Sequence, residues 1–134
     1  MRSRVILVIV FCVVASWARI PRNSSRLHSD DPAYSSALAA ANRFLQAWQT
    51  QDHETGIIML TDSARQQTSP ELLQIFFSPG AQAAYEIAHG RRINPGEYIF
   101  PVVLFGVSDK SRPHFSKIVV TRAGKDDWAI DRVP

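Results

Sequence analysis

The stretch EYIFPVVLFGV, residues 97–107, decides the fold because it is a strand-length run that is apolar on both faces. Side chains of a strand alternate between its faces. One face carries Tyr98, Phe100, Val102 and Leu104, and the other carries Ile99, Val103, Phe105 and Val107. A sheet with one solvated face alternates more cleanly than this. We therefore expect the second face to be covered too, by a curled sheet or by a partner subunit. Pro101 predicts a bulge or bend inside the strand.

Shorter strands surround this long one. Period-two alternation predicts them at 85–89, 115–122 and 128–133. Residues 94–96 (NPG) and 123–126 (AGKD) have the composition of turns. Arg91 and Arg92 follow Gly90 and form a local basic spot that could hold an anionic ligand, but a solvated turn is the interpretation we favour.

The helical part of the chain precedes the strands. Asp30 or Asp31 can cap a first helix whose apolar stripe runs from Tyr34 to Trp48 at helical spacing. A second helix is expected from about 54 to 64, capped by Asp52, and a third from 71 to 77. Helices followed by consecutive strands predict an α+β domain, with N-terminal helices packed on a curved, antiparallel, four-stranded sheet.

The first 31 residues differ from the rest. Basic residues, the apolar run 5–18 and a small-residue exit are typical of a secretory signal peptide, here residues 1–18, with cleavage after Ala18. Residues 19–31 are interpreted as a flexible spacer and 32–134 as the domain. The expected location is exported, either periplasmic or extracellular. Retention of residues 5–18 as an inner-membrane anchor is the alternative.

Charge and composition exclude several classes of function. Removing residues 1–18 removes two of the 15 basic residues and none of the 12 acidic ones, which leaves a nearly neutral domain. Such a domain has no electrostatic footprint for nucleic acid. The only cysteine, Cys12, would be lost with the signal peptide, so no disulfide or thiolate chemistry is expected. The four histidines lack metal-ligand spacing, and we predict neither a metal nor a cofactor.

Three short stretches carry a family resemblance. They are NRFLQAWQTQD at 42–52, GIIMLTDSA at 56–64 and WAID at 128–131. With the order of the elements, they resemble the nuclear transport factor 2-like superfamily over about residues 33–134. The resemblance implies a cone-shaped α+β fold. The superfamily includes isomerases, dehydratases, polyketide cyclases, secretion-system scaffolds and exported domains without an assigned activity, so the fold alone gives no function.

The isomerase branch of this superfamily can be tested residue by residue. Ketosteroid isomerases resemble this chain in the stretch from Arg43 through Asp52 to Asp62, Ser63 and Ala64, and they place a catalytic tyrosine after that arginine. Phe44 stands at this position here, without a hydroxyl group. Their basic aspartate corresponds to the region 67–69, which is QTS and contains no carboxylate. Proton abstraction beside a carbonyl needs both groups, so we do not expect this chemistry here. Whether the chain is an enzyme stays open, and a non-catalytic role is favoured.

Some residues remain as pocket candidates. Tyr34, Trp48, Tyr85 and Tyr98 could line a pocket, but helical or strand period already explains each of them as a core residue, which is the interpretation we favour. His89 and Asp131 could form an acid–base pair across the sheet, although surface or hairpin roles are favoured for both. On the last strand, we expect Trp128 and Ile130 to face the helices and Asp131 to point toward solvent or a partner.

These observations predict an exported, non-catalytic binding or assembly module of the bacterial cell envelope. A homodimer through the sheet and an envelope protein are the expected partners. One alternative is a pocket enzyme or carrier for a small apolar ligand. Another is a membrane-anchored scaffold subunit of an envelope complex, with residues 5–18 retained.

Overall fold

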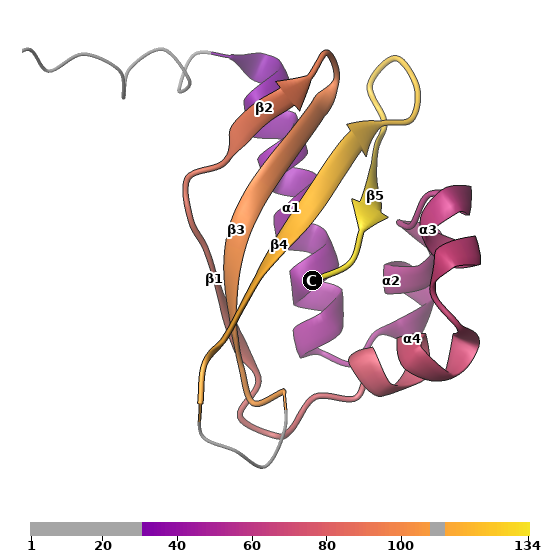
Figure 1. Cartoon of the computed structure of the whole chain (residues 1–134), viewed down its shortest axis with the longest axis vertical. Coiled ribbons are helices and arrows are strands. Elements are labelled where there is room, and N and C mark those ends of the chain that lie inside the picture. The colour runs from indigo at the N-terminus through magenta and orange to yellow at the C-terminus, as the bar shows by residue number, and fades with distance from the viewer. Residues whose placement is uncertain (1–30, 108–111) are drawn as a thin grey trace, which may run out of the picture.

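The computed structural model of the chain describes residues 31–107 and 112–134 (Figure 1). The predicted signal segment lies outside these residues, and so does the predicted spacer apart from Asp31. In the described part of the chain, no helix combines the length and the apolarity that crossing a membrane requires. Within residues 31–107 and 112–134, four helices precede five strands, so the predicted α+β class is confirmed.

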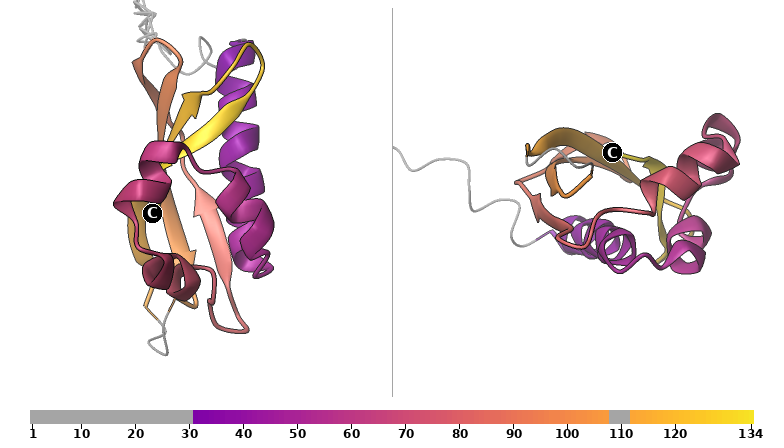
Figure 2. Two further views of the ribbon diagram at one scale, coloured as in Figure 1. Left: turned by 90° about the vertical axis from the view of Figure 1, so that its right-hand side faces the viewer. Right: turned by 90° about the horizontal axis from the view of Figure 1, so that it is seen from below.

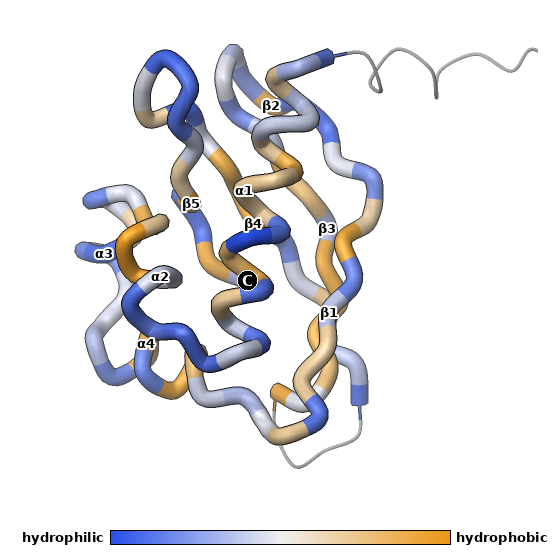
Figure 3. The backbone as a smooth tube through the Cα atoms, turned by 180° about the vertical axis from the view of Figure 1, so that it is seen from behind, coloured by the Kyte–Doolittle hydropathy of each residue, from blue (hydrophilic) through white to orange (hydrophobic). Residues whose placement is uncertain are grey.

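The first helix, α1 (Pro32–Gln49), begins where the sequence predicts. The carboxylate of Asp31 accepts a hydrogen bond from the backbone N–H of Ala33 at 3.0 Å, and Pro32 occupies the first turn, where its missing N–H costs nothing. One face of α1 is buried: Tyr34, Ala37, Ala41, Phe44, Leu45, Ala47 and Trp48. This stripe packs with the inner side chains of the sheet. Figure 3, seen from the helix side, shows α1 lying across the sheet.

The predicted second helix is in fact two, α2 (His53–Ile58) and α3 (Asp62–Gln67). The chain between them bonds to the last strand instead of continuing the helix. The N–H of Thr61 donates to the carbonyl of Ile130 at 2.9 Å, and the N–H of Ile130 donates to the carbonyl of Met59 at 2.8 Å. The Thr61 hydroxyl then caps α3. The single-helix prediction was wrong because it did not include this tertiary contact.

The last helix, α4 (Pro70–Phe76), follows the predicted cap. The Ser69 hydroxyl accepts a hydrogen bond from the N–H of Leu72 at 3.2 Å. Phe77, which ends α4, is fully buried, and its ring lies 2.1 Å from the position that a Cβ on Gly56 would take. A glycine that weakens α2 as a helix former therefore lets α4 pack closely against it.

The sheet is antiparallel, curved and unclosed. Its strands are β1 (Ala84–Ile87), β2 (Arg91–Asn94), β3 (Glu97–Phe105), β4 (His114–Arg122) and β5 (Trp128–Arg132). Both β1 and β2 pair with β3, which pairs with β4, and β4 pairs with β5. The predicted count of four strands was too low. The region of Arg91 and Arg92, interpreted as a solvated turn, forms the short strand β2 beside the N-terminal end of β3.

The edge of the sheet formed by β1 and β2 is interrupted opposite Pro101 of β3. The carbonyl of Pro101 accepts a hydrogen bond from the N–H of Ala88 at 2.9 Å. The N and O atoms of a strand residue point to the same side, so the missing N–H of Pro101 faces the gap between β1 and β2. On the other side, Pro101 pairs with Lys117 in unbroken register. The expected bulge is therefore absent from the pairing of β3 with β4, and the irregularity lies in the edge strand.

The two faces of β3 have different surroundings. Its inner face, Tyr98, Phe100, Val102 and Leu104, is at most 1% exposed and packs with the stripe of α1. The right-hand view of Figure 2 shows α1 against one face of the sheet and the shorter helices beside the β5 edge. The curved sheet does not close over its other side. There, an apolar surface that we call the outer patch is formed by Ile99, Pro101, Val103, Phe105 and Phe115.

Candidate functional site: a cavity at the start of the first helix

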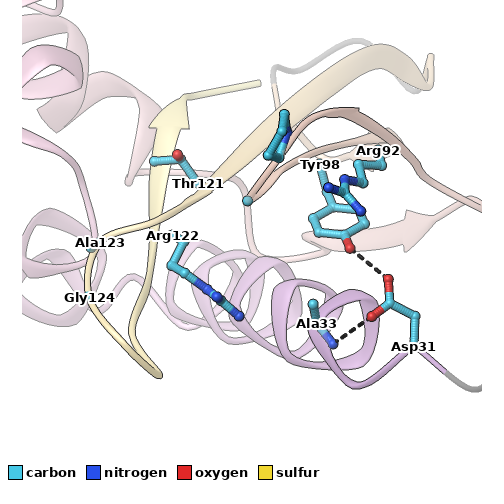
Figure 4. Close-up of a pocket in the computed structure, with 10 residues that line it drawn as sticks. Asp31, Ala33, Arg92, Tyr98, Thr121, Arg122, Ala123 and Gly124 are labelled. Carbon is cyan, nitrogen blue, oxygen red and sulfur yellow. Dashed lines mark hydrogen bonds between the residues drawn. The ribbon is translucent and has the colours of Figure 1, made fainter.

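A cavity of about 600 Å³ opens where α1 begins (Figure 4). The turn between β2 and β3 and the turn between β4 and β5 lie beside it, and all three segments are at the top of Figure 1. We call it the rim cavity. Its volume lies in the range of small-molecule sites, roughly 300–1,000 Å³. The charged and hydroxyl-bearing residues that line it are Asp31, Arg92, Tyr98, Thr121 and Arg122.

The Asp31 carboxylate is held from two directions. One oxygen accepts the N–H of Ala33, and the other accepts the hydroxyl of Tyr98 at 2.7 Å. The Tyr98 hydrogen bond is the main reason that the pKa of Asp31 lies below its ordinary value, and the positive charge of Arg92 acts in the same direction. Burial, followed by the contact with Asp31, raises the pKa of Tyr98. At neutral pH the carboxylate is therefore charged and the phenol protonated.

Two arginines reach the rim cavity from different strands. Arg92 belongs to β2, and its Nε donates to the carbonyl of Asn94 at 3.4 Å. Arg122 ends β4, and its guanidinium carbon lies 5.2 Å from the ring centre of Trp128, a cation–π contact. Among residues 31–107 and 112–134, the one ion pair within 4.0 Å lies elsewhere, on α3. Neither arginine thus has a carboxylate at salt-bridge distance within the described chain.

Three of the predicted site residues gather near this cavity. The hydroxyl of Tyr34 lies 3.3 Å from Nδ1 of His89 and accepts the N–H of Gly90 at 3.1 Å. The ring of Tyr34 meets that of Tyr98 edge-on, with centroids 5.8 Å apart. These contacts join the start of α1 to the connection between β1 and β2. The tyrosines thus act as ties within the fold, and Tyr98 also lines the cavity.

The other two aromatic candidates lie elsewhere. Trp48 is fully buried beside Phe76, and in the described chain its Nε1 is the buried side-chain polar atom that lacks a hydrogen-bond partner. Tyr85 is half-buried on β1 and donates its hydroxyl to the side-chain oxygen of Asn42. Burial raises the pKa of Tyr85. It lines a separate, shallow hollow of about 430 Å³ between α1 and β1. The four aromatic candidates therefore lie in different places: Tyr34 and Tyr98 near the start of α1, Trp48 in the core, and Tyr85 at the hollow between α1 and β1.

Asp131 is not placed beside His89. Asp131 belongs to β5 at one edge of the sheet, whereas His89 lies between β1 and β2 at the other edge, with β3 and β4 in between. The Asp131 carboxylate instead accepts the hydroxyl of Thr61 at 2.8 Å. The predicted acid–base pair across the sheet is not formed in this structure.

A β-bulge explains the direction of Asp131. Val120 pairs with Ile130 and Val119 pairs with Arg132, which leaves Asp131 as the extra residue on β5. Ile130 is fully buried under the helices, as expected. Asp131 faces Thr61 rather than solvent or a partner, contrary to the expectation, because strict alternation fails at a bulge.

Asp31 and Arg122 were not among the predicted site residues. The sequence indicated Asp31 only as a possible helix cap and Arg122 only as the end of a strand. A usable signal was present, because alternate turns of an antiparallel meander lie at the same end of a sheet. The turns at 94–96 and 123–126 flank β3 and β4 and therefore bring Arg92 and Arg122 to one end.

Comparison with known proteins does not extend this description. Neither a protein-family model, nor a curated protein, nor a solved structure matches the chain. Within the described residues, no group of three or more histidine, cysteine, aspartate or glutamate side chains is arranged to hold a metal ion. The site defines an α+β domain with a cationic cavity at one end and an apolar patch on one face of its sheet.

Proposed function

We propose that this chain is an exported, non-catalytic binding module that assembles with a second copy of itself through the outer patch. The observation that carries the proposal is Phe115, a large aromatic side chain that is 74% exposed. It pairs with Val103 on the face of the sheet opposite to α1. An exposed apolar patch with a polar border is typical of a protein interaction site.

Charges around the outer patch favour a second copy as the partner. By the register of the strands, the residues that border it on the same face are Glu86, Glu97, Arg91, Lys117 and Arg132. Two acidic and three basic residues make this border nearly neutral and of mixed sign. A two-fold symmetric contact joins a surface to itself, so its charges must be self-complementary. A mixed border meets this condition, whereas a border of one sign would repel its copy.

Export and family membership rest on the sequence. Residues 1–18 have the pattern of a signal peptide, which supports a place in the bacterial cell envelope. If residues 5–18 are retained, the same module would be a membrane-anchored scaffold subunit. The order of helices and strands supports the cone-like fold of the nuclear transport factor 2-like superfamily.

A carrier for a small apolar ligand is a second candidate function. The shallow hollow between α1 and β1 supports it, because Leu38, Tyr85 and Ile87 line this hollow and its volume is about 430 Å³. Mass spectrometry of the purified protein under native conditions would detect a co-purified apolar compound. Such a compound should be lost on Leu38→Asp, which changes a half-buried residue of the hollow.

Light scattering coupled to size-exclusion chromatography tests the assembly. The full chain is expressed with residues 1–30, purified as the host delivers it, and weighed by intact mass, which also reports cleavage. We expect a concentration-dependent dimer that Phe115→Lys converts to a monomer. Ile75→Lys is the matched control, because Ile75 is an equally exposed apolar residue on α4, 70% exposed. A monomer at every concentration, or equal loss of the dimer in both variants, would contradict the proposal. If the chain is monomeric and binds an envelope protein, and Phe115→Lys abolishes that binding, then the outer patch binds that protein and not a second copy.

A further inference from the structure

The rim cavity has a surplus of positive charge directed at one space. Arg92 and Arg122 bring two guanidinium groups, and Asp31 brings the single carboxylate among the lining residues. Figure 4 shows both arginine side chains extending toward the space above the start of α1. Their positive charges act on the same Tyr98 hydroxyl, because both lower the pKa that burial and Asp31 raise. Both cations therefore lie near this hydroxyl, and both line the same cavity.

Asp31 offsets part of this charge but forms an ion pair with neither arginine. Its oxygens are engaged by the N–H of Ala33 and the hydroxyl of Tyr98. No ion pair between Asp31 and either arginine occurs within 4.0 Å in the described chain. As the cap of α1, the Asp31 carboxylate already accepts a backbone N–H from the first turn of the helix. The proposed anion site therefore depends on the arginine side chains and not on the helix terminus.

We propose that the rim cavity binds the phosphate or carboxylate group of a small anionic ligand between Arg92 and Arg122. A guanidinium group presents a planar set of N–H donors that matches the oxygens of either group. One Arg92 nitrogen already donates to Asn94, and the Arg122 guanidinium lies over Trp128, so both are oriented before a ligand arrives. Preorganised side chains lose less entropy on binding.

The opening of the rim cavity fits a small molecule. Its volume of about 600 Å³ exceeds that of a single phosphate or carboxylate group, so a larger molecule that carries such a group can enter. The anionic group of that molecule would occupy the space between the arginines. The two turns, with Gly96 and Gly124, leave room for the remainder of the ligand. This site lies at the opposite end of β3 from Phe105 and Phe115, and it does not rest on the assembly proposed above.

Tryptophan fluorescence of the full chain provides the test, because Trp128 lies beneath Arg122. The protein is titrated with sodium phosphate and, separately, with sodium succinate, each against sodium chloride at equal ionic strength. We expect saturable binding of phosphate or succinate but not of chloride. The tighter of the two identifies the preferred group. Absence of saturable binding in both arms would overturn the proposal, and so would a chloride response of equal size.

Charge variants locate the site. Arg92→Gln and Arg122→Gln should each weaken binding roughly tenfold to a hundredfold, the effect of losing a charge-assisted hydrogen bond. Arg91→Gln is the matched control, since Arg91 neighbours Arg92 but pairs with Ile99 on the outer face of the sheet. It should bind as the unaltered protein does. Equal weakening in Arg91→Gln would overturn the assignment.

Asp31→Asn provides a gain of binding that a folding defect cannot imitate. Asparagine caps a helix about as well as aspartate: its side-chain oxygen can still accept the N–H of Ala33, and its NH2 group can donate to the Tyr98 hydroxyl oxygen in place of the present bond. The substitution removes the one negative charge of the lining, so the anion should bind more tightly. Unchanged or weaker binding in this variant would mean that the anion does not bind in the cavity that Asp31 lines with the two arginines, which would overturn the proposal.

Discussion

The two faces of β3 are nearly equal in apolar content and very different in environment. Phe100 on the inner face is fully buried against α1, while Pro101, the next residue, is exposed on the outer face. The inner face completes the core of this chain, whereas the outer patch adds little to it. An apolar residue in a strand therefore does not by itself report a contribution to folding. The contribution of such a residue depends on which other element covers its side chain, and the sequence of one strand does not contain that information.

Replacing one phenylalanine on each face gives the largest test of this comparison. Phe100→Ala should lower the free energy of unfolding by about 3–5 kcal/mol, because it removes a buried ring and leaves a cavity. Phe115→Ala, on the outer side, should change it by about 0.5 kcal/mol or less. Urea titration followed by circular dichroism measures both. Similar losses in the two variants would mean that the outer patch is part of the folding core.

Adding an atom to the inner face should cost less than deleting a ring. The Phe100 ring lies 2.3 Å from the position that a Cβ on Gly90 would occupy, so Gly90→Ala forces a fully buried side chain to move. We expect a loss of about 1–3 kcal/mol, typical of overpacking. Gly124→Ala is the control, because the nearest atom to its added Cβ is on the side chain of Asp127 at 3.4 Å. Thermal denaturation of both variants should separate them, and equal melting temperatures would contradict the close packing at Gly90.

Val119 does not follow this difference between the two faces, because it lies on the outer face and is nevertheless buried. It pairs with Ile99 on the outer face, yet it is only 5% exposed. The bulge on β5 places Arg132 beside it, and the stem of such a side chain can cover an apolar neighbour. Val119→Ala should then cost about 1–2 kcal/mol, the effect of losing two buried methyl groups. Val103→Ala, at a half-buried position further along the same face, should cost less. A reversed order in urea titrations would remove Val119 as an exception.

Local chemistry made much of the fold predictable. The Asp31 cap, the stripe of α1 and the alternation of Tyr98 to Leu104 each depend on neighbouring residues, and the structure has them where the sequence placed them. The missed features depend on distant residues. The helix α2 ends at Ile58 because the chain that follows pairs with the last strand, where Leu60 bridges to Ile130. The strand β2 exists because Arg91 and its neighbours pair with β3.

The candidate site was less predictable than the fold. Arg92 and Arg122 are far apart in the sequence, and only the pairing of β2, β3 and β4 brings them to one cavity. The pairing of His89 with Asp131 failed for the same reason, since the order of strands puts them at opposite edges. Residue type indicated which side chains could do chemistry. The topology decided which of them meet.

The smallest expected effect concerns the polar atom of the inner face, the Tyr98 hydroxyl. Its hydrogen bond is the main cause that lowers the pKa of Asp31 from 3.8, so Tyr98→Phe should move this pKa back toward 3.8. A carboxylate whose pKa is lowered by folding stabilises the folded state at pH values above its pKa in the unfolded state. That stabilisation is lost as the pH falls through its pKa in the folded state. The stability difference between the two proteins should therefore be largest above about pH 4 and shrink in more acidic solution. NMR titration of the Asp31 side-chain carbon measures the pKa directly, with Tyr85→Phe as the control, since Tyr85 bonds to Asn42 instead. An unchanged Asp31 pKa in Tyr98→Phe would mean that this inner-face hydroxyl does not hold the carboxylate at the rim cavity.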